Sequence, residues 1–243
     1  ELSWPEVEKL DRDIVVIYPL AALEQHSRHL PFFTDSILCE SIVTRLEAAL
    51  PKKILLLPVQ WLGASAHHLG VAGTLSAEAE TYLKIICEPL RCLLREKFQR
   101  VLIINGHGGN IDGFHLALRQ LAIEFPKALL AGASYWDLAE KEIAALLEGN
   151  RKSVGHACEF ETSLMLHLRP ELVRKNEIAD DEVKRPLGGL SALYIPLDMK
   201  RQTHHGGNGQ PTFATAKKGK ALLEIIIARG VKCVKEFSQT DPP

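Results

Sequence analysis

One group of residues in the first part of the chain is suited to bind a metal ion. Glu24 and His26 lie two residues apart, and Asp35 follows in the same segment. Residues two apart on extended backbone point to the same side, and Glu, His and Asp are ligands of Zn²⁺, Mn²⁺ and Fe²⁺. Asp35 alone could equally be the N-cap of a helix. The trio favours a metal site because it follows a buried, strand-like run.

A glycine-rich turn, Asn105-Gly-His107-Gly-Gly-Asn110, carries the next candidate ligand. Glycines beside a histidine let the backbone approach a ligand or metal closely. Such a turn is also typical of a plain strand-to-helix connection or an anion-binding loop at a helix N-terminus. The histidine at its centre is the informative part and favours the metal interpretation.

A third segment, His156-Ala-Cys-Glu159-Phe-Glu161-Thr-Ser163, combines a histidine with two acids. If the whole segment is helical, His156, Glu159 and Ser163 share one face, and Glu161 lies among apolar side chains. A carboxylate on an apolar stripe is costly unless it is paired or binds a cation. Alternatively, Glu161 caps the helix or pairs with an arginine, and Glu159 is solvated in the first turn. The residues alone leave open which acid joins the site.

Ser65 and His68 form a fourth group, in the segment after a second strand-like run. Both could face a substrate. The His204-His205 pair is a weaker candidate, because a histidine pair in a loop is more often solvated than liganding.

Together these residues predict hydrolytic metal chemistry. Five nitrogen and oxygen donors without a cysteine suit one or two divalent metals rather than a structural zinc site. Two metals about 3.5–4 Å apart need a bridging carboxylate, which Asp35 could supply, and such a centre lowers the pKa of bound water from 15.7 to about 7. Attack on an amide then requires a proton donor for the leaving nitrogen. His156 is our candidate, with Glu161 orienting it or holding the water.

The elements that must position these residues alternate along the chain. Continuous apolar runs predict four buried strands, and helical periodicity fills the segments between and after them. The expected strands are 13–20, 53–59, 100–105 and 128–134, and the expected helices are 36–50, 76–99, 110–125, 137–148 and 214–237, the last with a possible break at Gly230. This alternation predicts an α/β layered fold with a mostly parallel central sheet flanked by helices, in one domain over residues 1–243. Ligands collect at the carboxyl ends of such strands, so the polar groups that follow three of them should converge.

Composition narrows the function classes. The 243 residues are 46% hydrophobic and carry a net charge of -1, which gives no electrostatic footprint for nucleic acid or an anionic membrane. No apolar run reaches the roughly 18–20 residues that span a bilayer. Five cysteines without a C-x-x-C pair fit reduced thiols and a cytoplasmic location.

The motifs resemble those of the creatininase (creatinine amidohydrolase) family over most of the chain. The segment 23–35 resembles the family's E-Q-H-G-x-H-L-P-x-x-T-D block, residues 105–110 match N-G-H-G-G-N, and 156–163 resembles H-A-G-E-x-E-T-S. A late segment, 206–215, resembles G-x-x-G-D-P-x-x-A-T. Several blocks in the same order are specific for the family and much less so for a substrate.

The resemblance implies a creatininase-like α/β fold that hydrolyses C–N bonds of small cyclic amides, linear amides or formamides with metal-activated water. It implies two divalent metals per subunit (Zn, Mn or Fe), a homo-oligomer that can be a hexamer, and a small amide substrate. The implied metal ligands are Glu24, His26, Asp35, His107 and Glu159, with Asp35 bridging and Glu161 beside them, and Ser65 and His156 match substrate-contacting positions of the family. We therefore predict these five metal ligands, His156 and Glu161 as catalytic residues, and Ser65, His68 and Gly108 as substrate contacts. Glu159 enters as the fifth ligand because creatininase proper has its remaining ligand where Gly109 stands here.

Departures from the family pattern concern the substrate pocket. Lys152-Ser153 stand where creatininase proper has a Trp-Asp pair that helps to hold creatinine, and His67 stands where the family has Glu. We therefore expect a substrate other than creatinine. Two alternatives remain: a non-catalytic metal-containing sensor of the same fold, and a nucleotide- or sugar-phosphate-binding module that uses residues 105–110 as an anion loop.

Overall fold

A four-stranded parallel sheet forms the centre of the molecule. The computed structural model describes residues 1–184, 193, 195–196 and 198–243. The strands are β1 (Val15–Leu20), β2 (Ile54–Leu56), β3 (Arg100–Asn105) and β4 (Leu129–Ser134), in the spatial order β2-β1-β3-β4. Every neighbouring pair is parallel. All residues of β1 and β3 are buried, as expected for central strands that are covered on both faces.

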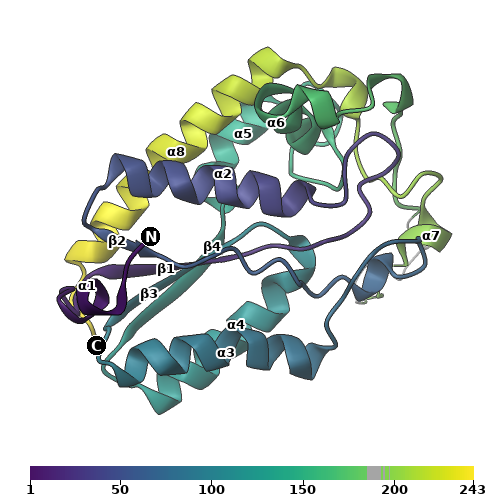
Figure 1. Cartoon of the computed structure of the whole chain (residues 1–243). Coiled ribbons are helices and arrows are strands. Elements are labelled where there is room, and N and C mark those ends of the chain that lie inside the picture. The colour runs from purple at the N-terminus through teal and green to yellow at the C-terminus, as the bar shows by residue number, and fades with distance from the viewer. Residues whose placement is uncertain (185–192, 194, 197) are drawn as a thin grey trace.

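Helices cover both faces of the sheet, as Figure 1 shows. The side chains of β1 alternate between two apolar cores: Val15 and Ile17 pack with one set of helices, Val16 and Tyr18 with the other. The helices are α1 (Trp4–Glu8), α2 (Thr34–Ala49), α3 (Ala79–Arg95), α4 (Ile111–Glu124), α5 (Glu140–Leu146), α6 (Glu159–Leu168), α7 (Met199–Gln202) and α8 (Ala216–Gln239). Helices α2, α5, α6 and α8 supply the first core, and α3 and α4 supply the second. The predicted layered α/β fold is confirmed.

Most expected elements differ from the observed ones by a few residues at their ends; the expected helix 76–99, for example, is α3 over Ala79–Arg95. Strand β2 ends at Leu56 rather than 59, because its pairing with β1 is interrupted after the Leu57 N–H bonds Ile17 O and resumes only at Gln60, whose N–H bonds Pro19 O. Helix α8 continues through Gly230, which does not break it but packs against α2: a Cβ there would lie 2.7 Å from Leu46 Cδ2. Helix α6 begins at Glu159, so the interpretation of His156 as part of that helix is wrong.

Part of the segment 176–211, whose weak periodicity and many Gly, Pro and His residues favour an excursion over the site, lies outside the described residues. Over the described part of the chain, no helix is both long and apolar enough to cross a membrane.

Candidate metal centre

The site lies at the carboxyl ends of β1 and β3, on the right of Figure 1. Because the chain moves from β1 to β2 on one side and reaches β3 on the other, these two strands flank the point where ligands bind in open α/β sheets. Glu24 and His26 follow β1, His107 follows β3, and Asp35 lies in the first turn of α2. The predicted convergence of distant segments is confirmed for these four residues.

Asp35 lies between two histidines. Its Oδ1 is 3.0 Å from His26 Nε2, and its Oδ2 is 3.3 Å from His107 Nδ1. Glu24 Oε1 lies 3.2 Å from the same His107 nitrogen. All four residues are buried. The two carboxylate oxygens of Asp35 therefore face different imidazoles, which is the arrangement of a bridging ligand.

The asparagines of the glycine-rich turn hold His107 in place. Asn105 Nδ2 donates to His107 O at 2.7 Å, and the His107 N–H donates to Asn105 Oδ1 at 3.2 Å. Asn110 Nδ2 donates to Ala21 O at 3.0 Å, which ties the turn to the segment after β1. The turn is thus organised around the histidine, with its asparagines directed inward.

Glu161 is the third buried carboxylate of the site. Its Oε1 lies 3.9 Å from His26 Nε2, and its Oε2 accepts the Cys158 N–H at 3.3 Å, at the start of α6. Burial raises the pKa of Glu161 to about 7, with nearby Asp35 acting in the same direction and His26 opposing it. The capping role and the site role are therefore compatible, since each uses a different oxygen.

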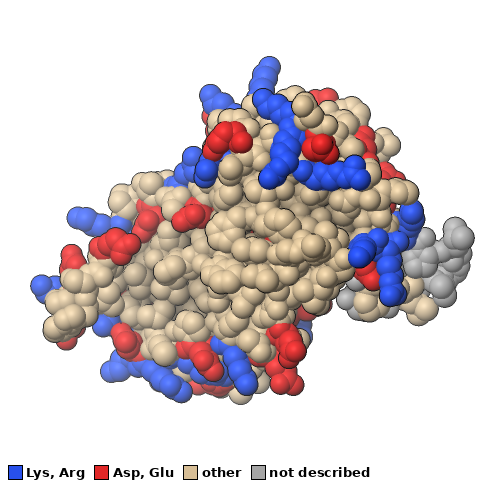
Figure 2. Space-filling model, turned by 45° about the vertical axis from the view of Figure 1, so that its right-hand side comes forward, with Lys and Arg blue, Asp and Glu red and all other residues tan. Residues whose placement is uncertain are grey.

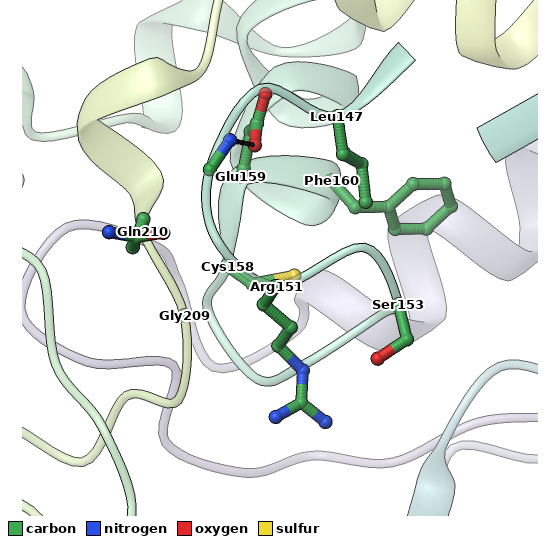
Figure 3. A pocket seen from close by; sticks show the side chains of 9 residues that line it. Leu147, Arg151, Ser153, Cys158, Glu159, Phe160, Gly209 and Gln210 are labelled. Atoms are coloured by element: carbon green, nitrogen blue, oxygen red, sulfur yellow. Dashed lines mark hydrogen bonds between the residues drawn. The ribbon is translucent and has the colours of Figure 1, made fainter. Parts of the chain in front are cut away.

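Glu159 lies apart from this cluster, and the expectation that it is the fifth ligand is corrected. Its carboxylate pairs with Lys218 of α8 and accepts the backbone N–H groups of Glu148 and Gly149. Figure 3 shows it beside a small pocket on the loop 147–153, with Gln210 nearby. Glu159 and Glu161 are two residues apart in a helix, so their side chains point in different directions.

The cluster has the properties of a cation site. Several of its buried polar atoms make no hydrogen bond to any described residue: Glu24 Oε1 and Oε2, His26 Nε2 and Asp35 Oδ2. Within the described ranges, Glu24, Asp35 and Glu161 form ion pairs only with histidines, not with lysine or arginine. Buried carboxylates of this kind require a compensating positive charge. The donor set fits a divalent metal.

The pKa values of the clustered residues are shifted because buried carboxylates and imidazoles lie next to one another. Burial disfavours a charged imidazole, but the neighbouring carboxylates outweigh it, so the pKa of His26 rises to about 9 and that of His107 rises well above its usual range. The pKa values of Asp35 and Glu24 are lowered, because the histidines outweigh the effect of burial. The acids therefore hold positive charge at the two positions where metal ligands are expected.

The predicted substrate and catalytic residues surround this cluster. Ser65 Oγ lies 3.3 Å from His107 Nε2, on the side of the ring away from Glu24. His68 Nε2 and His156 Nδ1 lie 3.3 Å and 3.5 Å from Glu24 Oε1. Burial lowers the pKa of His156 to about 3, with His26 acting in the same direction, so it is neutral at pH 7.

Among the residues that the structure describes, potential metal ligands group only at this cluster. Among the described residues, every set of three or more is drawn from Glu24, His26, Asp35, His67, His68, His107, His156 and Glu161. Neither Glu159 nor the His204-His205 pair belongs to such a set. Sequence reasoning missed His67, whose ring stacks on that of His107 at 5.7 Å, and Gln25, which contacts two of the histidines.

The two adjacent glycines of the turn have opposite surroundings. A Cβ on Gly109 would lie 2.3 Å from Ala64 O and 2.5 Å from His107 Nε2, whereas a Cβ on Gly108 would meet no atom of the described residues within 4 Å. Gly109 is therefore needed for the close packing of His107, and Gly108 faces open space.

Gly109→Ala is expected to lower the free energy of unfolding by about 1–3 kcal/mol, the usual cost of overpacking, and to weaken metal binding by displacing His107. Gly108→Ala is the matched control, with stability and metal content close to those of the wild type. Thermal melts and metal analysis of both variants measure this difference. Equal stability and metal content in the two variants would contradict the role given to Gly109.

Comparisons with known proteins find similar sequences over nearly the whole chain. A family model described as "Creatininase: Creatinine amidohydrolase" matches residues 1–234. A mycofactocin precursor peptide peptidase from Mycobacterium ulcerans is 28% identical, over 99% of this chain and 87% of the relative. A creatinine amidohydrolase from Pseudomonas putida is 28% identical, over 97% of this chain and 95% of the relative.

Solved structures share the whole fold. A putative creatinine amidohydrolase from Bacteroides fragilis superimposes with a TM-score of 0.83 at 29% identity, over 98% of this chain and 95% of that chain. A mutant creatininase described as Zn-Zn type has a TM-score of 0.81 at 26% identity, over 99% of this chain and 97% of that chain. The structure named "Creatininase Mn" has the same TM-score, 0.81, at 27% identity, over 99% and 98% of the two chains.

Proposed function

The chain belongs to the creatininase family, and from that premise we propose that it is a metal-dependent amidohydrolase. It hydrolyses a C–N bond of a small cyclic amide, linear amide or formamide. The relatives named for creatinine and for a peptide precursor support an amide substrate. The departures at Lys152-Ser153 and His67 support a substrate other than creatinine.

Two divalent metals are proposed, held on either side of Asp35. Glu24 and His107 would hold one metal, His26 and Glu161 the other, and the two oxygens of Asp35 would bridge them. This assignment replaces Glu159 with Glu161 as the fifth ligand. The zinc and manganese forms of the similar creatininases support zinc or manganese as the bound element.

A bound divalent pair would lower the pKa of a water molecule from 15.7 to about 7 and polarise the amide carbonyl. His156, whose Nδ1 lies 3.5 Å from Glu24 Oε1, would accept the proton that the attacking water loses. A C–O bond forms at the amide carbon. The C–N bond then breaks, its electron pair leaves with nitrogen, and nitrogen takes the proton from His156. The products are a carboxylic acid and an amine.

The observation that carries this proposal is the position of Asp35. One carboxylate whose oxygens face two histidines, with Glu24 and Glu161 beside them, offers each metal a carboxylate, an imidazole and a shared bridge. The test is turnover of creatinine, linear amides, formamides and short peptides, with and without a chelator. We expect hydrolysis of an amide that stops on chelation and returns with Zn²⁺ or Mn²⁺.

The other outcomes identify the alternatives. Protein that binds metal and an amide without turning it over is a sensor. Protein that binds inorganic phosphate and no transition metal is an anion-binding module. Either result would contradict the hydrolase proposal.

His156→Ala is expected to lower kcat by about 10²–10⁴-fold, the usual contribution of a general acid–base group, while metal content stays unchanged. His115→Ala is the matched control, because His115 is exposed on α4. Steady-state kinetics and metal analysis give both quantities. A His156→Ala variant with wild-type turnover would exclude it from proton transfer.

A cytoplasmic homo-oligomer, with a hexamer as one possible form, is also proposed. The five free cysteines support a reducing compartment. Figure 2 shows few charged side chains at the centre of one face, with most of them along its margins, which supports contact with another subunit. Light scattering after size-exclusion chromatography measures the subunit number.

A further inference from the structure

Gln25, between two of the proposed ligands, has a buried side chain with a fixed orientation. Its Oε1 accepts the Ser27 N–H at 2.9 Å, and its Nε2 donates to Gly206 O at 2.8 Å. The residue is 2% exposed. Reversing the amide would place its oxygen against the Gly206 carbonyl oxygen and its NH₂ against the Ser27 N–H. Both contacts therefore require the orientation observed.

The side-chain amide faces two imidazoles. Its Nε2 lies 2.7 Å from His68 Nδ1 and 3.1 Å from His156 Nε2. The amide nitrogen has only two hydrogens, and one of them is used by Gly206. A single hydrogen remains for the two histidines.

The backbone oxygen of Gln25 determines which histidine accepts the remaining amide hydrogen. His156 Nε2 lies 2.7 Å from the backbone oxygen of Gln25, and a carbonyl oxygen only accepts. His156 Nε2 therefore carries a hydrogen and donates it to that oxygen, so it cannot accept one from the amide. The remaining amide hydrogen points to His68 Nδ1, which must present a lone pair. The opposite assignment would leave both 2.7 Å contacts without a hydrogen bond.

We propose that Gln25 is a positioning residue that fixes the tautomer of His68, with the hydrogen on Nε2 directed toward Glu24. His156 is held in the same tautomer by the backbone of Gln25, but its ring is turned so that Nδ1 faces Glu24 Oε1 at 3.5 Å, whereas His68 presents Nε2 at 3.3 Å. The two imidazoles thus offer opposite groups to the site: His68 a donor and His156 an acceptor.

A donor on His68 and an acceptor on His156 would have different roles in amide hydrolysis. This part of the inference rests on the proposed function. Water loses a proton as it attacks, and the acceptor on His156 takes it. The donor on His68 is directed at Glu24 Oε1 and holds this proposed ligand in place. Without the amide of Gln25, His68 is free to place its hydrogen on Nδ1 and present a lone pair instead.

The test is ¹⁵N NMR of histidine-labelled, zinc-loaded full-length protein, with His68 and His156 assigned from His68→Asn and His156→Asn spectra. In the wild type we expect His68 to carry its hydrogen on Nε2. In Gln25→Leu, His68 should shift toward the other tautomer or a mixture, while His156 keeps its own because the backbone oxygen remains. A wild-type His68 with the hydrogen on Nδ1, or an unchanged His68 in Gln25→Leu, would overturn the proposal.

Kinetics provide the second readout. Gln25→Leu should lower kcat by about 10–100-fold, as expected for a residue that orients site groups, with a smaller effect on KM. The matched control is Gln60→Leu, because Gln60 follows β2 and bonds the Leu62 N–H rather than a histidine. A kcat loss without a tautomer change would mean that Gln25 acts by packing alone. The NMR result needs no turnover, so a failure of the proposed function is distinguishable from a failure of this inference.

Discussion

Asp35→Asn is expected to abolish metal binding and to lower turnover by at least about 10³-fold. The variant keeps the size of the side chain but loses the charge that both histidines face. If Asp35 bridges two metals as proposed, neither metal would keep its full ligand set in the variant, and the activation of water at neutral pH would be lost together with the proton transfer that depends on it. Elemental analysis of the purified variant and steady-state kinetics on the best amide substrate measure both effects.

The matched control is Asp112→Asn, which makes the same change in the first turn of α4. Asp112 is exposed and lies outside every group of potential ligands in the described chain. It should keep wild-type metal content and activity. An Asp35→Asn variant that retains its full metal content would show that Asp35 does not bridge.

The second large effect is expected from Glu161→Gln, compared with Glu159→Gln. Glu161 faces His26 in the cluster, whereas Glu159 pairs with Lys218. Glu161→Gln should lose at least one metal per chain and fall in kcat by about 10²-fold or more, because Glu161 is a proposed direct ligand and even a change next to one costs about 10–100-fold. Glu159→Gln should keep the full metal content. Metal analysis and kinetics of the two variants, prepared in parallel, measure the difference.

Glu159→Gln should instead lower the free energy of unfolding by about 1.5–3 kcal/mol, the usual value of hydrogen bonds to a charged group. Lys218 retains Glu148 as a partner at 3.3 Å, which limits the loss. Denaturant unfolding measures it. A Glu159→Gln variant that loses metal while Glu161→Gln keeps it would restore Glu159 as the ligand.

The sequence was sufficient to predict the central sheet and the convergence of its strand ends. Continuous apolar runs marked β1 and β3 because central parallel strands are buried on both faces, and the polar residues that follow them meet at one edge by geometry alone. The length of β2 was less predictable, since pairing with β1, rather than local composition, decides where it ends.

The choice between Glu159 and Glu161 could not be made from the sequence. Both acids lie in the first turn of α6, and their roles depend on where that helix begins and on what packs beside it. Lys218, which pairs with Glu159, lies in α8, far along the chain. No local pattern signals that contact.

Gln25 was missed for a related reason. A glutamine between two candidate ligands is easily taken for a residue that only connects them, because its side chain suggests neither metal binding nor acid–base chemistry. Its role depends on Gly206 and His156, which reach it only in the folded chain. The one sequence signal for Gln25 was its position inside the segment 23–35, which resembles a motif of the family.

Crystals of the full-length chain grown with zinc, measured at the zinc absorption edge, test the central claim most directly. We predict two anomalous peaks about 3.5–4 Å apart on either side of Asp35, with Glu24 and His107 near one and His26 and Glu161 near the other. Zinc bound elsewhere, with no peak at bonding distance of about 2.0–2.2 Å from these side chains, would contradict the account.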